Sequence, residues 1–264
     1  MPINAWIISL NPEAETAQNL RDTLLTGGIN AQFFAAVDGR REMPKFEVGE
    51  QLSQIKALIY RKAKLTTSEV GCYLSHLRAI RQAYIQGDSH VCIFEDDVVA
   101  EPGLGDLIKD IALLSEDFHL VRLMALKIRK RKLLHKLPSG YTLTRPERGA
   151  LGCQGYVLNR TGMKKMLNAS TAIHMPIDKV VDSFFLYDLH CFSVEPHAIY
   201  EQLHHSTIVK TAGKLDKRPW VKLIWHLNKL YRSARRRLHY LKHYSAFYPT
   251  AKPEGKHGKS QRIR

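Results

Sequence analysis

The stretch of sequence that decides the fold is VCIFEDDVV, from Val91 to Val99. Its leading apolar residues are typical of a short strand that is buried on both faces, as in a parallel or mixed sheet covered by helices. Adjacent carboxylates cannot lie unpaired inside such a core, because their desolvation is too costly. We therefore expect Glu95, Asp96 and Asp97 to emerge at the carboxyl end of the strand, where open α/β sheets place their ligands.

The acidic triplet also predicts a metal site. Three neighbouring negative charges repel one another, and a bound divalent cation relieves that repulsion. Carboxylate oxygens are hard ligands, which suit Mg²⁺ or Mn²⁺. The same three residues are compatible with a solvated turn, so this interpretation depends on the rest of the chain.

Length and composition limit the possible classes of protein. The 264 residues suffice for one large domain, or for one domain with an appendage. No apolar run approaches the ~20 residues that span a bilayer, and the first residues lack a signal-peptide pattern. The cysteines form no CxxC pair, which argues against a zinc or disulfide framework and favours buried thiols in a reducing cytoplasm. They are Cys72, Cys92, Cys153 and Cys191.

The net charge of +15 is concentrated at the end of the chain. Residues 213–264 contain 15 Lys or Arg and two acids, which gives +13, whereas residues 1–212 carry only +2. We therefore expect a nearly neutral folded domain over 1–212 and a basic tail over 213–264. Within the tail, residues 218–230 have apolar side chains at helical spacing with bases between them, and residues 251–264 have the composition of a disordered end.

The first forty residues predict a β-α-β unit. Strands are expected over 3–10 and 31–36, with a helix over 13–26 that ends at a Gly-Gly pair. The two strands of such a unit are parallel, so their carboxyl ends share one edge of the sheet. Candidate ligand-binding residues at that edge, beside the acidic triplet, are Ser9, Leu10 and Asp38, the last of which is also compatible with a simple turn.

A helix is predicted to begin after Thr66, because Thr66 and Glu69 have the spacing of a capping box. Small residues follow at about one-turn intervals, which indicates that another part of the molecule or a ligand approaches this face closely. Ser75 and His76 on this helix are candidates for donor binding, although a histidine inside a helix is more often structural.

The middle of the chain alternates further helices and strands. Gly155 closes a glycine-rich segment and would permit close approach of a ligand or of another strand. The basic run 127–132 is typical of a solvated hairpin, and contact with an acidic acceptor is the alternative. Helices are expected over 51–61, 103–115 and 159–168, and strands over 118–123 and 190–194.

A second acidic element lies at 175–185. Asp178 and Asp182 are four residues apart and therefore share one face of a predicted helix. Two acids beside an apolar Phe-Phe pair suit a general base with a shifted pKa. A solvent-facing pair is an equally good interpretation of the pattern alone.

Three segments together resemble the family 25 glycosyltransferases. They are Ser68–His76, Phe94–Val98 and Gly152–Tyr156, and the likeness extends over about residues 3–210. This family comprises the lipooligosaccharide and lipopolysaccharide galactosyltransferases of Gram-negative bacteria, together with the collagen galactosyltransferases. The basic tail is not covered by the resemblance.

The resemblance implies a GT-A-type α/β fold, in which a Rossmann-like mixed sheet is flanked by helices and binds a nucleotide sugar. It further implies an inverting transfer that depends on Mn²⁺ or Mg²⁺, with a UDP-sugar as donor. By family habit the sugar is galactose, and the acceptor is a lipid-linked oligosaccharide of lipooligosaccharide or lipopolysaccharide.

The resemblance also assigns roles to the acids. Asp97 would ligate the metal directly, Glu95 takes the place of the first aspartate of a DXD-type motif, and Asp96 supports them. His204 stands where related enzymes supply a late metal ligand. Asp182 is the first choice for the base that deprotonates the acceptor hydroxyl, and Asp178 is the second.

These inferences predict a cytoplasmic enzyme that lies on the inner face of the bacterial inner membrane. Cationic amphipathic helices with tryptophan suit an anionic membrane surface, so the tail would provide the attachment. Its composition would also bind nucleic acid phosphates, but no specific nucleic acid is expected. The rival hypothesis is an inactive transferase-fold protein that docks on membrane or nucleic acid through the tail.

Overall fold

The computed structural model describes residues 3–201 and 215–252. Within them, ten strands occur: β1 (Asn4–Ser9), β2 (Asn30–Ala35), β3 (His90–Glu95), β4 (Val98–Ala100), β5 (Leu120–Arg122), β6 (Arg131–Lys136), β7 (Thr142–Pro146), β8 (Gly155–Asn159), β9 (Cys191–Glu195) and β10 (Ile199–Glu201). The helices of the same part of the chain are α1 (Glu15–Thr26), α2 (Gln54–Arg61), α3 (Thr67–Gln86), α4 (Leu104–Ala112), α5 (Arg160–Ala169), α6 (Ile177–Asp182), α7 (Phe184–Tyr187), α8 (Pro219–Lys242) and α9 (Tyr244–Phe247).

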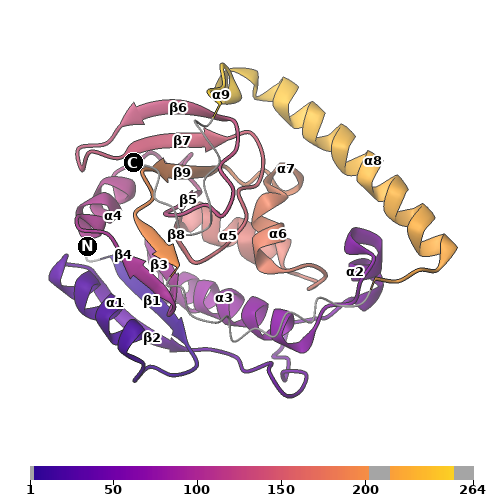
Figure 1. Ribbon diagram of the computed structural model, residues 1–264, viewed down its shortest axis with the longest axis horizontal. Coiled ribbons are helices and arrows are strands. Elements are labelled where there is room, and N and C mark those ends of the chain that lie inside the picture. The colour runs from indigo at the N-terminus through magenta and orange to yellow at the C-terminus, as the bar shows by residue number, and fades with distance from the viewer. Residues whose placement is uncertain (1–2, 202–214, 253–264) are drawn as a thin grey trace.

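Eight of the described strands form one mixed sheet, in the order β2-β1-β3-β8-β5-β9-β7-β6 (Figure 1). Strand β1 pairs in parallel with both β2 and β3, so the carboxyl ends of these three strands share one edge. Strand β8 runs antiparallel between β3 and β5, and β4 pairs with β10 in a separate ribbon. The predicted fold, a mixed α/β sheet, is confirmed.

Helices cover both faces of the sheet, because side chains alternate along each strand. Ala5 and Ile7 of β1 join a core cluster that includes residues of α1 and α4. Trp6 and Ile8 join the opposite cluster, which includes residues of α3, α5 and α6. The predicted β-α-β unit and the helices flanking the sheet are therefore confirmed.

Helix α3 begins as predicted, with a complete capping box between Thr66 and Glu69. Gly71 is required by the close approach of the loop after β2, since a Cβ there would lie 2.6 Å from the carbonyl oxygen of Val37. The small residues of this helix thus make room for backbone rather than for a ligand. At the end of α1, Gly28 is the residue in the left-handed conformation (φ +77°).

Helix α8 runs along the outside of the molecule and packs against α2 and α7 (Figure 1). Polar contacts fix its inner side: Asn228 Nδ2 donates to the carbonyl of Ile59 (3.3 Å), and Arg232 Nη2 donates to Ser183 Oγ (2.6 Å). The predicted basic helix of the tail is confirmed over these residues. The predicted disordered end, 251–264, falls mostly outside the described residues.

The cysteines and the basic run can be compared with the expectations for them. All four cysteines are free thiols, of which Cys92 and Cys153 are buried and Cys72 and Cys191 are partly buried. The basic run 127–132 leads into β6, which forms an antiparallel hairpin with β7. None of the described helices combines the length and apolar character needed to cross a membrane.

Candidate active site

The acidic triplet lies at the carboxyl edge of the three parallel strands. Glu95 ends β3, and Ser9 ends the neighbouring strand β1. Ser9 Oγ donates a hydrogen bond to Asp96 Oδ2 and accepts one from the backbone amide of Asn11 (3.0 Å). These bonds tie the turn that carries the triplet to the loop after β1. The sequence therefore placed Ser9 and the three acids at one edge correctly.

Asp97 is the carboxylate whose protonation is most perturbed. Desolvation, followed by the nearby charges of Glu95, Glu201 and Asp96, raises its pKa to about 7, although the side chain reaches solvent. Desolvation also raises the pKa of Asp96. The hydrogen bond that Asp96 accepts from Ser9 lowers this pKa and so offsets part of the increase. Like charges close together disfavour ionisation, so this edge is a place where negative charge is crowded.

Glu201 belongs to this cluster, and sequence reasoning missed it. Pairing of β10 with β4 sets Glu201 opposite Val98, directly after the triplet. Gln154 Nε2 donates to Glu201 Oε1 (2.6 Å), which holds the carboxylate in place. No local pattern marks Glu201, because its position depends on pairing between strands that are a hundred residues apart.

The carboxylates of the acidic edge are candidate ligands for a divalent cation. None of the Lys and Arg side chains that the structure describes forms an ion pair with Glu95, Asp96, Asp97 or Glu201. Carboxylate oxygens are the ligands that hard cations such as Mg²⁺ and Mn²⁺ prefer. Among the described residues at this edge, Glu95 shares with Cys72 and His76 a group of ligand atoms that lie within 4.8 Å of one another, and the charges of Asp97 and Glu201 lie nearby. His204, the other predicted ligand, lies outside the described residues.

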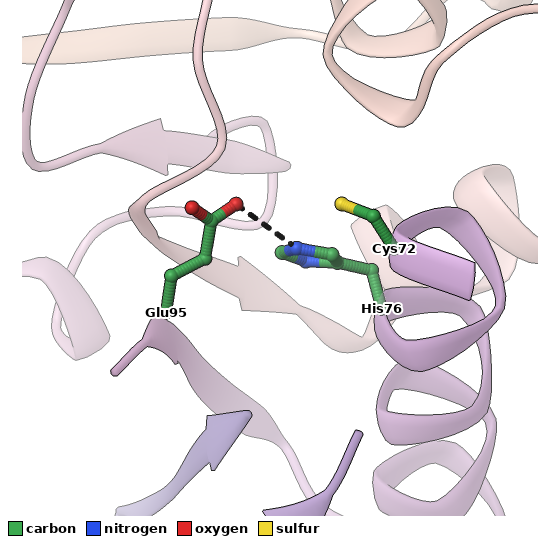
Figure 2. A group of neighbouring side chains, drawn as sticks. All are labelled: Cys72, His76 and Glu95. Atoms are coloured by element: carbon green, nitrogen blue, oxygen red, sulfur yellow. Dashed lines mark ion pairs between the residues drawn. The ribbon is translucent and has the colours of Figure 1, made fainter. Parts of the chain in front are cut away.

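Glu95 is oriented by His76 of helix α3, as Figure 2 shows. His76 Nε2 lies 3.4 Å from Glu95 Oε1, and His76 Nδ1 lies 3.0 Å from the hydroxyl of Tyr156. The imidazole is only 1% exposed, and its Nε2 makes no hydrogen bond to any residue that the structure describes. Ligand atoms of Cys72, His76 and Glu95 all lie within 4.8 Å of one another. Cys72, one turn earlier on α3, points toward the same space (Figure 2).

The two acids of α6 have different surroundings. Asp182 Oδ1 accepts a hydrogen bond from Arg122 Nη2 (2.8 Å) and lies 3.3 Å from the amide nitrogen of Leu151. Both partners of the ion pair are largely buried. Gly149 makes this arrangement possible, since a Cβ there would lie 2.1 Å from the carboxyl carbon of Asp182.

Asp178 has no such fixed partner. Its nearest cation is the half-exposed Lys179, 3.7 Å away, and desolvation raises its pKa. Burial raises the pKa of the Cys72 thiol, and the charges of Glu95, Asp178 and Asp97 raise it further, so both acidic elements lie near this thiol. Asp182 is thus paired with a buried arginine, whereas Asp178 has only the half-exposed Lys179 beside it.

Two further residues predicted to bind the donor make close contacts within the protein. Ser75 is buried, donates to the carbonyl of Gly71 and accepts from the amide of Val37 (both 2.8 Å). Gly155 lies in the core, where a Cβ would come within 2.3 Å of Ile199.

The remaining candidates lie at the sheet edge. Leu10 is 45% exposed directly after β1. Asp38 is exposed and pairs with Arg40 at 2.7 Å, and this hydrogen bond lowers its pKa to about 2. Both side chains are accessible, and neither is held in a fixed position by the core.

Residues 3–181 match the model of glycosyltransferase family 25, which is described as a lipopolysaccharide biosynthesis protein. The chain belongs to glycosyltransferase family 25. The matched region contains the whole acidic edge apart from Glu201, as well as Asp178. The resemblance predicted from the sequence is thus confirmed.

Curated relatives of this family 25 glycosyltransferase are similar over most of the chain. The lacto-N-neotetraose biosynthesis glycosyltransferase LgtE of Neisseria gonorrhoeae is 25% identical, covering 79% of this chain and 78% of the relative. A putative glycosyltransferase of Haemophilus influenzae is 27% identical, and the match covers 69% of this chain and 62% of the relative. Procollagen galactosyltransferase 1 of Danio rerio is 23% identical over 74% of this chain and 35% of its own length.

Among solved structures, the glycosyltransferase GlyE of Streptococcus pneumoniae aligns with a TM-score of 0.40 and 11% identity. The alignment covers 96% of this chain and 66% of that one. This likeness is too distant to support a conclusion about substrates.

Proposed function

We propose that this family 25 glycosyltransferase moves galactose from UDP-galactose to a lipid-linked oligosaccharide of lipooligosaccharide or lipopolysaccharide, with inversion at the sugar. The observation that carries the proposal is the crowding of Glu95, Asp97 and Glu201 at the carboxyl edge of parallel strands, where nucleotides bind in α/β sheets. The similarity to LgtE, a lacto-N-neotetraose biosynthesis enzyme, supports an oligosaccharide acceptor, and the similarity to the procollagen galactosyltransferase supports galactose as the sugar.

The acidic edge would bind the diphosphate end of the donor. A divalent ion, when bound there, neutralises negative charge on the diphosphate as UDP departs. His76 holds Glu95 in a fixed orientation for that ion, and Ser9 holds the turn through Asp96. The exposed Leu10 and Asp38 are proposed to line the nucleotide end of the same edge, and His204 stays a predicted additional ligand.

Asp178 is our candidate for the general base. The acceptor hydroxyl oxygen forms a bond to the anomeric carbon while the bond from that carbon to the UDP oxygen breaks. The hydroxyl proton passes to the Asp178 carboxylate, and UDP leaves with the electron pair. A base works best when its pKa lies near the working pH, and desolvation moves the pKa of Asp178 in that direction. Asp182, paired with Arg122, is proposed to fix the position of α6.

The test is UDP release from UDP-galactose, UDP-glucose and UDP-N-acetylglucosamine, with Mn²⁺ or with EDTA, in the presence of a lipooligosaccharide acceptor. Turnover of UDP-galactose that requires Mn²⁺ and is lost in Asp97→Ala and Asp178→Asn would support the proposal. Turnover of another donor would change the sugar. Failure of every donor to bind or react would instead support the rival, a binding protein that acts through its tail.

We further propose that α8 attaches the enzyme to an anionic membrane surface. Its inner side is held by polar contacts, whereas apolar side chains point outward: Leu223, Leu227 and Leu230 are 57–68% exposed, and Trp220 is 45% exposed. Ordinary surface helices have the opposite arrangement. Bases between these apolar side chains would meet lipid headgroups, with about 1 kcal/mol for each base near the surface.

Sedimentation with phosphatidylglycerol-containing vesicles tests this attachment. Leu223→Ser/Leu227→Ser should release the protein from vesicles, whereas Leu113→Ser, at an exposed site at the end of α4, should not. Equal vesicle binding by both variants would contradict the proposal, and binding to pure phosphatidylcholine would contradict the role of anionic lipid.

A further inference from the structure

A group of histidines lies away from the acidic edge, where the C-terminal helix meets the body. His239 and His243 are one turn apart at the end of α8. Asp188 follows α7, and His190 immediately precedes β9. The four residues come from two segments some fifty residues apart, and the family 25 match ends before both of them.

The ligand atoms of this group have the spacing of a metal site. One ligand atom each from Asp188, His239 and His243 lies within 4.8 Å of the others. Nε2 of His190 and Nε2 of His243 lie 3.7 Å and 3.9 Å from the same oxygen, Asp188 Oδ1. These separations are too long for hydrogen bonds. They suit an ion about 2.0–2.2 Å from each ligand atom.

The imidazole nitrogens of this group lack partners. Nε2 of His190, His239 and His243 are all buried without a hydrogen bond to any residue that the structure describes. His239 is only 8% exposed, so water does not replace the missing partner easily. Buried polar atoms are normally paired, and three unpaired nitrogens in one group indicate a missing ligand.

Other contacts already orient the ligands. His190 Nδ1 lies 3.1 Å from the carbonyl oxygen of Asp117, and the proton it donates there leaves a lone pair on Nε2. Lys165 Nζ binds Asp188 Oδ2 at 3.1 Å, so Oδ1 remains for the histidines. Metal-binding histidines typically have such a carbonyl partner on the second nitrogen.

The Asp188 carboxylate lies beside the imidazole nitrogens of His239 and His243. It supplies negative charge for a divalent cation bound among them.

We propose that Asp188, His239 and His243 form a structural Zn²⁺ site that clamps the C-terminal helix onto the catalytic body, with His190 beside Asp188 at its margin. Two imidazole nitrogens and one carboxylate oxygen form a donor set typical of zinc. The site would connect helix α8 to the segment between α7 and β9. The bound ion would therefore stabilise the packing of α8 against the body of the protein.

Equilibrium dialysis of the full-length chain without a polyhistidine tag tests the site, with Zn²⁺ and with Co²⁺ as a spectroscopic probe. All proteins in this experiment carry Asp97→Ala, which removes a candidate ligand at the acidic edge. Metal bound at that edge is then not counted. We expect one Zn²⁺ per chain, visible absorption bands of tetrahedral Co²⁺, and a rise in melting temperature on adding Zn²⁺.

The variants His243→Ala and Asp188→Asn should each weaken Zn²⁺ binding at least tenfold and abolish the stabilisation. Both residues are partly exposed, so the variants are expected to fold. His226→Ala, at an exposed position on the same helix, is the matched control and should bind as the parent does. Absence of Zn²⁺ binding, or equal binding by all three variants, would overturn the proposal.

Discussion

Two groups of carboxylates in this molecule have opposite surroundings. Asp182 is buried against Arg122 at 2.8 Å, and its position is fixed within the protein. At the acidic edge, Glu95, Asp97 and Glu201 crowd together without any Lys or Arg ion pair among the described residues. Asp182 is thus balanced by an arginine of the protein, whereas no described basic side chain forms an ion pair with the carboxylates of the acidic edge.

This difference separates acids that are paired within the protein from acids that are not, which sequence spacing does not do. Asp178 and Asp182 share a helix and look equivalent as a pattern, yet only Asp178 lacks a buried basic partner. A carboxylate that already neutralises an arginine is a poor proton acceptor, because protonation would leave the arginine unpaired. The experiments below test this contrast, starting with the largest expected effect.

Asp97→Ala should lower sugar transfer by roughly 1,000-fold, because it removes a ligand of the ion that offsets diphosphate charge. The measurement is UDP release at saturating Mn²⁺. Asp106→Ala removes an exposed acid on α4 and serves as the control with unchanged activity. Full activity of Asp97→Ala would show that the acidic edge needs no external cation.

Arg122→Ala should destabilise the fold by about 3–5 kcal/mol, since the buried Asp182 carboxylate would lose its partner. Urea unfolding followed by circular dichroism measures the loss. The double variant Arg122→Met/Asp182→Leu should recover much of the stability, because neither charge is then left unpaired. A loss that persists unchanged in the double variant would argue against the ion pair as the cause.

His76→Ala should weaken activation by Mn²⁺ about 10- to 100-fold, as is usual when the group that orients a metal ligand is removed. The effect should appear as a higher Mn²⁺ concentration for half-maximal activity, with partial recovery at high Mn²⁺. His135→Ala, at an exposed position on β6, provides the comparison. An unchanged Mn²⁺ requirement would show that Glu95 does not depend on His76.

Asp97→Asn should stabilise the metal-free protein, with the smallest effect of this series. The pKa of Asp97 is raised from 3.8 to about 7, so the folded state keeps a proton that the unfolded state releases over that range. The stabilising contribution of that proton is therefore present below about pH 4 and is lost as the pH rises through about 7. Because the side chain reaches solvent, the expected gain for Asp97→Asn near pH 8 is on the order of 1 kcal/mol.

Melting temperatures of wild type and Asp97→Asn, measured with EDTA from about pH 4 to pH 8, check this prediction. The difference between the two proteins should grow with pH. A constant difference would mean that Asp97 titrates normally and that the edge is not crowded.

The sequence by itself determined the local elements and the position of the acidic triplet in the sheet. The apolar run before Glu95, the capping box at Thr66 and the β-α-β start all depend on neighbouring residues, and each was predicted correctly. Parallel pairing then required Ser9 and the acidic triplet to share an edge. The family resemblance depended on the same short motifs.

Only the tertiary structure decided which acids are paired. Arg122 reaches Asp182 across 60 residues, Glu201 joins the acidic edge through β10, and His239 meets Asp188 through the docking of α8. The residues around each of these side chains do not indicate which distant side chain it will contact. Charge balance in a protein depends on distances in space, and local patterns in the sequence do not record those distances.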